Sequence, residues 1–325
     1  MNSPNDPKSK LGSAVTRTRT GSQGSCPDGE KSLRVGLLPE AGWQRRNLQF
    51  IQRILIPSIF SKRTGAEQLP DFPELDEGQI GITWIGHATF LIQVGGANIL
   101  VDPNWAMWHS IVKRVRRPGL KIEHLPPIDA VLVSHAHHDH LHLPSLREVA
   151  NQQPILVPAG VGKIVHRRGF GEVREMGYWE SFEFGDIEII HTPAQHWGAR
   201  LIHDTHRSFG GYLIKYGGRA IYHCGDSAYF DGFGEIGDNC DIDVALMPIG
   251  AYGAPSGRAV HMNPEEALDA FGELGAKMIV PMHYGTFPLG QEPMHEPLER
   301  LVSEANRRGV AEQLKVLAEG RTVIF

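Results

Sequence analysis

Short apolar runs separated by glycines dominate the chain from about residue 80 onward. The runs ITWIG, TFLIQV and ILVDP follow one another, and the turn sequence GGAN lies between the second and the third. Short apolar or alternating runs bounded by glycine are typical of strands, and a tight glycine turn joins antiparallel neighbours. This stretch therefore predicts an antiparallel meander. A long loop follows, and then DAVLVSH, which predicts a buried strand.

The second half alternates predicted strands with predicted helices, which indicates a layered α/β fold. NPEEALDAFGEL predicts a helix with Asn263 as its N-cap and Pro264 in its first turn. EPLERLVSEANRRG predicts a last helix that closes at Gly309, followed by an edge strand RTVIF. Two shorter helices are expected in LPSLREVANQ and around residues 161–168. Strands are expected in PILVP, SFEFGDIEIIHTPAQHW, GGYLIKYGGRAIYHCGD, DVALMPIGAY and KMIVPMHYG.

The N-terminal region divides into two parts. Residues 1–32 hold too little apolar content to bury, so a disordered tail is expected there, with residues 33–325 forming a single folded domain. Within that domain, Leu48, Ile51, Leu55 and Ile59 recur at helical spacing in NLQFIQRILIPSIF, despite Pro57. This helix either covers the core or the site, or meets lipid or an acyl chain.

Composition narrows the classes of protein. With 325 residues, 41% hydrophobic residues, a formal charge of -5 and a pI near 6.4, the chain is expected to be globular and soluble, without nucleic acid as a partner. Three cysteines without a CxxC pair fit a reducing compartment, and no apolar run is long enough to span a membrane. The expected location is the cytoplasm, with membrane association as an alternative.

Apolar strands repeatedly end in polar residues that can bind metal. DAVLVSH ends at His135, IEIIHTPAQH at His196, AIYHCGD at Asp226 and KMIVPMH at His283. Loops beyond strand ends are where a layered fold brings side chains from distant sequence together. The four strand ends therefore predict one common site.

The densest chemistry lies in SHAHHDHLHL, from Ser134 to Leu143. Crowded imidazoles repel one another once protonated, so the cluster favours a bound cation in place of the protons. Zinc prefers nitrogen and carboxylate ligands of this kind, with iron, manganese or nickel as alternatives. Isolated histidines, namely His87, His166 and His295, are interpreted as surface or core residues.

The donors exceed what one ion can use while leaving a position open for substrate. Two ions accommodate them, with three terminal donors each and one bridging carboxylate. The candidate ligands are His135, His137, Asp139, His140, His196, Asp226 and His283.

The same motifs resemble the metallo-β-lactamase superfamily. HAHHDH, TPAQHW, HCGD and MHYGTF match its ordered motifs, and GITWIGHATFLIQVGGANILVDP, KRVRRPG, PIGAY and HMNPEEA resemble the N-acyl-phosphatidylethanolamine-hydrolysing phospholipase D family and its bacterial relatives. The resemblance implies a four-layer αββα sandwich with a dinuclear zinc site along one edge.

Carried over by position, the resemblance assigns each ligand. His135, His137 and His196 would bind one zinc, while Asp139, His140 and His283 would bind the other. Asp226 would bridge the two ions, and His138 would be a non-ligand.

Two ions lower the pKa of a shared water, so a bridging hydroxide is the expected nucleophile. Asp139 would orient that water and shuttle its proton, and His261 would approach the phosphate or leaving group or only cap the following helix. Gln195 and Tyr252 are candidate substrate-binding residues, and Cys224 is a small strand residue that supports the loop of Asp226.

The favoured function is a zinc phosphodiesterase that acts on a phospholipid such as an N-acyl-phosphatidylethanolamine. The basic run from Lys113 to Arg117 and the apolar N-terminal helix support this substrate, and peripheral membrane contact follows from it as a hypothesis. The alternatives are a lactonase or carboxylic-ester hydrolase, and a non-hydrolytic metal protein or lipid-binding module. The oligomeric state is left open, a homodimer included.

Overall fold

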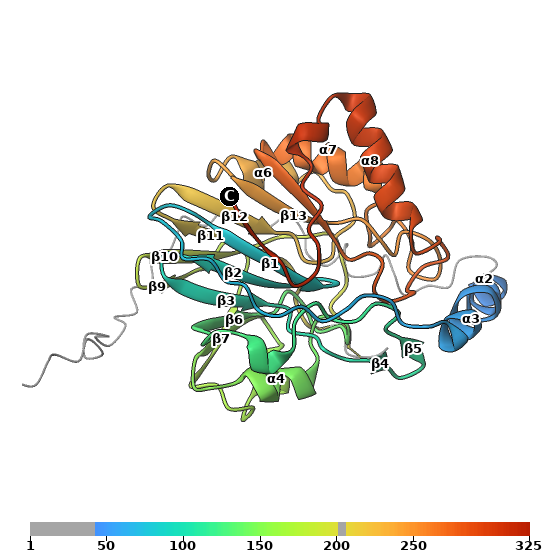
Figure 1. Cartoon of the computed structure of the whole chain (residues 1–325), viewed down its shortest axis with the longest axis horizontal. Coiled ribbons are helices and arrows are strands. Elements are labelled where there is room, and N and C mark those ends of the chain that lie inside the picture. Colours follow the sequence, from blue (N-terminus) through green and yellow to red (C-terminus); the bar gives the residue numbers. More distant parts are fainter. Residues whose placement is uncertain (1–42, 201–205) are drawn as a thin grey trace, which may run out of the picture.

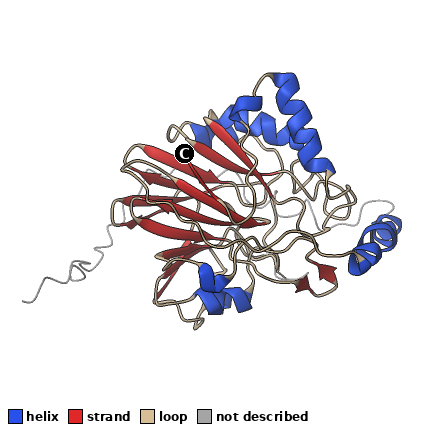
Figure 2. Ribbon diagram, viewed as in Figure 1, coloured by secondary structure: helices blue, strands red, loops and turns tan. Residues whose placement is uncertain are grey.

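Two stacked β-sheets form the middle of the molecule, and helices cover their outer faces (Figures 1 and 2). This computed structural model describes residues 43–200 and 206–325. The expected tail, residues 1–32, lies outside the described residues, and the division into tail and single domain stays a prediction. The αββα layering and the mixed α/β class are as the sequence predicts.

The first sheet contains seven strands in the order β15-β1-β2-β3-β6-β7-β8. It begins with the predicted antiparallel meander and continues with parallel strands. RTVIF pairs with β1 at the sheet edge, as predicted. The strands are β1 (Gly81–Gly86), β2 (Thr89–Val94), β3 (Ala97–Val101), β6 (Ala130–Leu132), β7 (Pro154–Pro158), β8 (Glu172–Met176) and β15 (Thr322–Ile324).

The second sheet contains six strands in the order β14-β13-β12-β11-β10-β9. Strands β9 to β12 are antiparallel, and β12, β13 and β14 are parallel. The strands are β9 (Ser181–Phe184), β10 (Ile187–Thr192), β11 (Gly211–Tyr216), β12 (Arg219–His223), β13 (Val244–Pro248) and β14 (Met278–Met282).

Alternation along the strands divides the core into two layers. Phe90 and Ile92 of β2 face the second sheet, whereas Leu91 between them packs with the helices on the opposite side. Side chains on a strand point alternately to its two faces, so a strand buried on both faces is apolar throughout. This explains why ITWIG and TFLIQV are nearly continuous apolar runs.

Helices close the sandwich on both sides. On the first sheet lie α4 (Leu143–Val149) and α5 (Gly162–Val165); on the second lie α6 (Phe233–Gly237), α7 (Pro264–Leu274) and α8 (Glu296–Arg308). Helix α7 begins with a full capping box between Asn263 and Glu266, and α8 ends at Gly309 in the left-handed conformation. Single 3-10 turns are η2 (Ile122–His124) and η3 (Ala311–Gln313).

The N-terminal helix forms, and the apolar side chains that recur at helical spacing along it are only partly buried. It consists of α2 (Trp43–Phe50), a π-helical turn η1 (Ile51–Leu55) and α3 (Ile56–Phe60). The amide of Ile56 bonds the carbonyl of Ile51, so the widened turn ends just before Pro57, which has no amide hydrogen to donate. Leu55 is buried, whereas Leu48 and Ile51 are exposed, because the π turn rotates the two halves relative to each other.

The structure contains three elements that the sequence did not predict. Strand β8 forms the far edge of the first sheet, α6 is a single short helix, and the stretch expected as a long loop contains a small hairpin. The hairpin joins β4 (Trp108–His109) to β5 (Val112–Lys113). In the described residues, no helix is long and apolar enough to cross a membrane.

Candidate metal centre

The candidate ligands lie together because their strands run in the same direction. In the first sheet, β1 and β6 both run parallel to β3; in the second, β10, β12 and β14 share one direction. The carboxyl ends of such strands meet at one sheet edge. The loops that leave these ends carry His87, the SHAHHDH run, His196, Asp226 and His283.

The first group of donors joins the histidine-rich loop to the second sheet. The ligand atoms of His135, His137, His196 and Asp226 all lie within 4.8 Å of one another. Nδ1 of His137 is 2.9 Å from Nε2 of His135 and 3.1 Å from Nε2 of His196. Nitrogens bound to one tetrahedral zinc lie about 3.3 Å apart, so these three nitrogens converge as ligands would.

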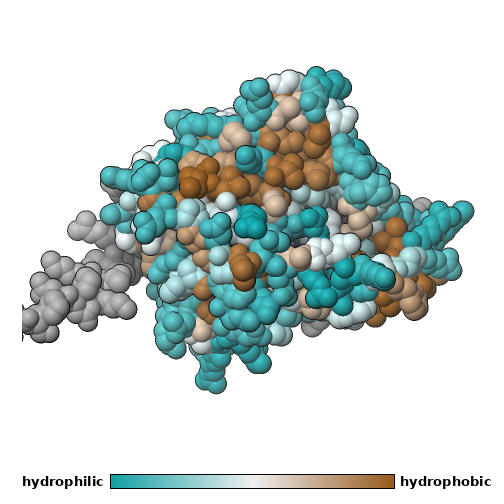
Figure 3. All heavy atoms as spheres, in the orientation of Figure 1, coloured by the Kyte–Doolittle hydropathy of each residue, from teal (hydrophilic) through white to brown (hydrophobic). Residues whose placement is uncertain are grey.

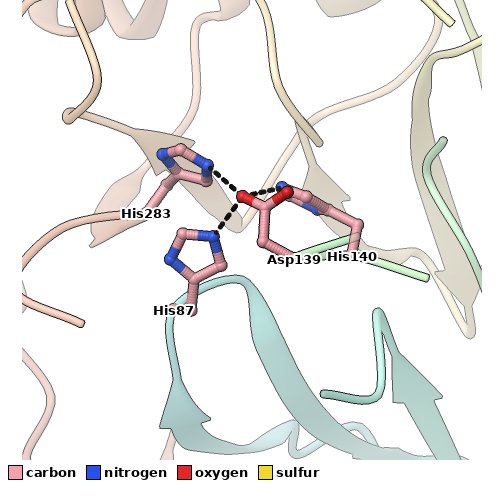
Figure 4. A group of neighbouring side chains, drawn as sticks. All are labelled: His87, Asp139, His140 and His283. Carbon is pink, nitrogen blue, oxygen red and sulfur yellow. Dashed lines mark hydrogen bonds and ion pairs between the residues drawn. The ribbon is translucent and has the colours of Figure 1, made fainter. Parts of the chain in front are cut away.

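A second group of donors is centred on Asp139 (Figure 4). It contains His87, Asp139, His140 and His283, with ligand atoms again within 4.8 Å of one another. Oδ2 of Asp139 is 2.9 Å from Nε2 of His87, 3.4 Å from Nε2 of His283 and 3.7 Å from Nε2 of His140. In Figure 4 the three imidazoles point toward this carboxylate from separate segments.

Asp226 lies between the two groups. Its Oδ2 is 3.1 Å from Nε2 of both His140 and His283, and 3.7 Å from Nε2 of His135. A third group of Asp226, His261 and His283 shares members with the other two. A carboxylate that bridges two ions requires this position. The ligand roles of Asp226 and of the histidines stay predictions.

Buried nitrogens without partners show that the centre fits metal ions. Among the described residues, Nε2 of His137, His140 and His283 and Oδ1 of Asp226 are buried and make no hydrogen bond. Leaving such groups unpaired is costly unless something binds them. Of these atoms, Nε2 of His140 and Nε2 of His283 both lie 3.1 Å from Oδ2 of Asp226, and nitrogen and carboxylate donors of this kind suit a cation of the zinc type.

The charge balance of these side chains supports the same conclusion. Burial lowers the pKa of His137 to about 3 and that of His196 to about 4, so both imidazoles are neutral at pH 7, the form in which histidine can bind a metal. Burial also acts on His140 and His283, but Asp226 and neighbouring carboxylates outweigh it and raise the pKa of both. The raised pKa values mean that both imidazoles hold an additional proton. These protons occupy positions that metal ions would take, so metal binding would release them.

Hydrogen bonds around the centre orient the rings. Nδ1–H of His140 donates to Asp102, at 2.7 Å, and Nδ1–H of His196 donates to the carbonyl of Val260, at 2.8 Å. Asp102 also accepts hydrogen bonds from the amide and the hydroxyl of Ser134. Each ring therefore turns Nε2 toward the centre, which fixes the tautomer needed for a ligand.

The backbone around the site adopts unusual conformations. His87, His283 and Asp102 have positive φ values of 58°, 59° and 45°. Residues other than glycine adopt this region at a cost, and such strain concentrates at functional sites. Gly225, with φ of 64°, precedes Asp226, and a side chain there would meet the carbonyl of Gly210 at 2.6 Å. The HCGD turn thus requires glycine.

His87 was interpreted from the sequence as a surface or core residue, and it is a buried one that lies beside the centre. It is 1% exposed and hydrogen-bonds Asp139, because the ITWIG strand ends beside the histidine-rich loop. The signal was present, since ITWIGH also ends an apolar strand in a histidine. The exposed His138 lies outside all three donor groups, as expected.

The other predicted residues have specific surroundings. His261 lies against the centre, with Nδ1 3.9 Å from Oδ2 of Asp226. Gln195 uses its backbone, which donates to Ser227 and accepts from Ala228, to join the loops of His196 and Asp226. The Tyr252 hydroxyl donates to Glu296 on α8, at 2.9 Å. Cys224 is fully buried behind Asp226.

Sequence reasoning also missed Asn104, which links the hairpin to the centre. Nδ2 of Asn104 donates to the carbonyl of Asp139, at 2.6 Å, and lies 3.0 Å from Nε2 of His109. The buried guanidinium of Arg114 holds the carbonyls of Asn104 and Ala106. Lys113 and Arg114 are buried, so half of the basic run is structural.

Replacing His87 with glutamine is expected to weaken metal binding at the Asp139 group by about 10–100-fold, because Asp139 loses the imidazole that fixes its carboxylate. Competition with a zinc-chelating dye measures this affinity. His166→Gln provides the control, since His166 lies outside all three donor groups. Equal affinities for the two variants would exclude a role for His87.

Comparisons with known proteins agree with this geometry. The model of the β-lactamase superfamily domain matches residues 97–284. An uncharacterised protein of Mycobacterium tuberculosis is 33% identical over 251 residues, which cover 73% of this chain and 67% of that protein. The N-acyl-phosphatidylethanolamine-hydrolysing phospholipase D 1 of Caenorhabditis elegans is 35% identical over 248 residues, which cover 69% of each.

A solved structure extends the similarity to the fold. A metallo hydrolase from the archaeon Ignicoccus hospitalis superposes with a TM-score of 0.60 at 26% identity, covering 76% of this chain and 98% of that one. The sandwich, the strand-end donors and the matched domain agree, and the chain belongs to the metallo-β-lactamase superfamily as one of its metal-dependent hydrolases.

Proposed function

We propose that this protein is a zinc-dependent phosphodiesterase that cleaves a phospholipid of the N-acyl-phosphatidylethanolamine type. The observation that carries the proposal is the pair of donor groups joined by Asp226, which belongs to the first group and contacts His140 and His283 of the second; such a pair suits in-line displacement at phosphorus. The similarity to the nematode phospholipase D supports the phospholipid as substrate. Two ions held there would lower the pKa of a shared water and neutralise charge on the phosphoryl oxygens.

Asp139 has the position and the charge to orient a water. Burial raises the pKa of its carboxyl, but His140, His283 and His87 outweigh this and hold the pKa well below its usual range. The group is therefore ionised at neutral pH and accepts hydrogen bonds. A carboxylate with so low a pKa binds a proton weakly, so orientation is its stronger contribution.

His261 is the candidate donor to the substrate. Burial lowers its pKa well below the usual range, so the ring is neutral and keeps one N–H. Its Nδ1 makes no hydrogen bond to the described residues and lies 3.9 Å from Oδ2 of Asp226. From there it can donate to a phosphoryl oxygen or to the leaving group.

A lactonase or carboxylic-ester hydrolase is the second candidate, because the same centre can direct water to an activated carbonyl. The deciding experiment is a panel of an N-acyl-phosphatidylethanolamine, a bis-aryl phosphodiester and a homoserine lactone, offered to the zinc-loaded wild type and to Asp226→Ala. The proposal predicts phosphodiester cleavage that the variant loses. Lactone cleavage without phosphodiester cleavage would support the second candidate.

Metal analysis distinguishes the phosphodiesterase and the lactonase or esterase from a non-hydrolytic metal protein. About two equivalents of zinc per chain are expected for a dinuclear hydrolase. A single iron together with oxygen consumption would contradict hydrolysis. A cytoplasmic location and a homodimer stay predictions.

A further inference from the structure

We propose that an exposed apolar patch beside the metal centre docks on an anionic lipid bilayer. The patch consists of Leu48, Ile51, Ile56 and Phe60 on the N-terminal helix and Trp108 and Ile111 on the hairpin of β4 and β5. These six side chains are 41–82% exposed. The inference adds a partner to the proposed function, and its test requires no turnover.

Direct contacts make the helix and the hairpin one surface. Nζ of Lys113, on β5, bonds the carbonyl of Ile59 at the end of α3, at 2.9 Å. The guanidinium of Arg63 lies 5.6 Å from the centre of the Trp108 ring, and its Nε donates to the carbonyl of Arg114. A cation at a helix C-terminus is favourable, so Lys113 fastens α3 to the hairpin.

Phe60 is the most exposed member of the patch, at 82%. Large apolar side chains that gather on an exposed helix are typical of interaction sites rather than of ordinary surface. Figure 3 shows apolar residues over the N-terminal helices, at the right of the view. In Figure 1 these helices project from the sandwich, where a flat partner can reach them.

Charge selects the lipid surface over other partners. The segment from Trp43 to Arg63 contains five Arg and Lys residues and no Asp or Glu, although the whole chain carries a formal charge of -5. Arg45, Arg53 and Lys62 are exposed beside the apolar side chains. A basic helix with exposed apolar residues lies in the headgroup region of anionic membranes.

The hairpin connects the patch to the metal centre. Trp108 and His109 are adjacent on β4, so their side chains point to opposite faces. Trp108 belongs to the patch, while His109 contacts Asn104, whose Nδ2 holds the carbonyl of Asp139. On the other side, Gln291 bonds the carbonyl of Arg46 and ties α2 to the segment that follows His283. A bilayer on the patch would therefore lie beside the centre.

The test is co-sedimentation of the full chain with vesicles of phosphatidylcholine, with and without phosphatidylserine. Wild type is expected to bind the anionic vesicles and to be released by salt. The double variant Ile56→Ser/Phe60→Ser is expected to lose at least about tenfold in partitioning, and Arg53→Gln about fivefold. Val302→Ser, at an exposed apolar position on α8, is the matched control and should bind as wild type does.

Two further measurements make the result unambiguous. Hydrolysis of a soluble bis-aryl phosphodiester should be the same in wild type and the double variant, which separates docking from chemistry and from misfolding. Sedimentation velocity reports self-association. Absence of binding to anionic vesicles, equal binding by the double variant, or a dimer that the double variant dissociates while vesicle binding persists would each overturn the proposal.

Discussion

Replacing Asp226 with alanine is expected to lower kcat/KM by at least about 10³-fold, or about 4 kcal/mol in transition-state stabilisation. One carboxylate oxygen lies within 3.9 Å of nitrogens from His135, His140, His196, His261 and His283. Without it, the first donor group loses its carboxylate, and His140 and His283 of the second group lose a contact at 3.1 Å. The metal content should fall from two equivalents to one or fewer, measured by elemental analysis of the purified variant.

Two variants control the Asp226 experiment. Asp226→Asn keeps the shape of the side chain and removes its charge, so it should retain the fold and still lose most of the activity. Asp238→Asn removes an exposed carboxylate at the end of α6 and should behave as wild type. If Asp226→Ala retained both ions and the wild-type rate, the proposal that Asp226 bridges the two ions would be wrong.

Replacing Asp102 with alanine is expected to damage both stability and metal binding. Asp102 is fully buried and accepts from the Ser134 amide at 2.7 Å, the Ser134 hydroxyl at 2.6 Å and Nδ1 of His140 at 2.7 Å. Its loss leaves several buried donors unpaired, which costs about 3–5 kcal/mol in the free energy of unfolding. Affinity for the ion bound by His140 should fall about 10–100-fold.

Urea unfolding of the metal-free protein and zinc competition measure the two effects of Asp102→Ala separately. Asp129→Ala is the matched control. Asp129 lies just before the start of β6, whereas Ser134 and the histidine-rich loop lie after the other end of that strand. Its carboxylate accepts from the Asn98 amide, at 2.8 Å, so the expected loss is about 1 kcal/mol with unchanged zinc affinity. Wild-type zinc affinity in Asp102→Ala would show that His140 needs no carboxylate to orient it.

Local patterns in the sequence were sufficient for most of the fold. Apolar runs ending in glycine located the strands, and Asn263 and Gly309 marked helix ends, because these signals act within a few residues. The face of the N-terminal helix could not be predicted, since a π turn before Pro57 changes the helical phase. Edge strand β8 was missed because only one of its five residues is buried and it lacks an apolar run.

Some residues of the candidate site could likewise be predicted from the sequence, and others could not. Residues within the histidine-rich run, and those that end long apolar strands, could be found because the chemistry is dense or the position is distinctive. His87 and Asp102 are single residues that follow β1 and β3, and their contacts with Asp139 and His140 in the loop after β6 form only in the folded sheet. Asn104 acts through contacts with Asp139 and His109 that no spacing rule predicts.

The placement of every donor at a strand end has a consequence for biosynthesis. The donors extend from His87 on the first sheet to His283 on the second, so a nascent chain that has formed only one sheet holds an incomplete set. Such an intermediate would retain ions weakly, because chelation requires both halves. Metallation should therefore follow translation of His283 and docking of the sheets, and ion supply would limit maturation rather than early folding.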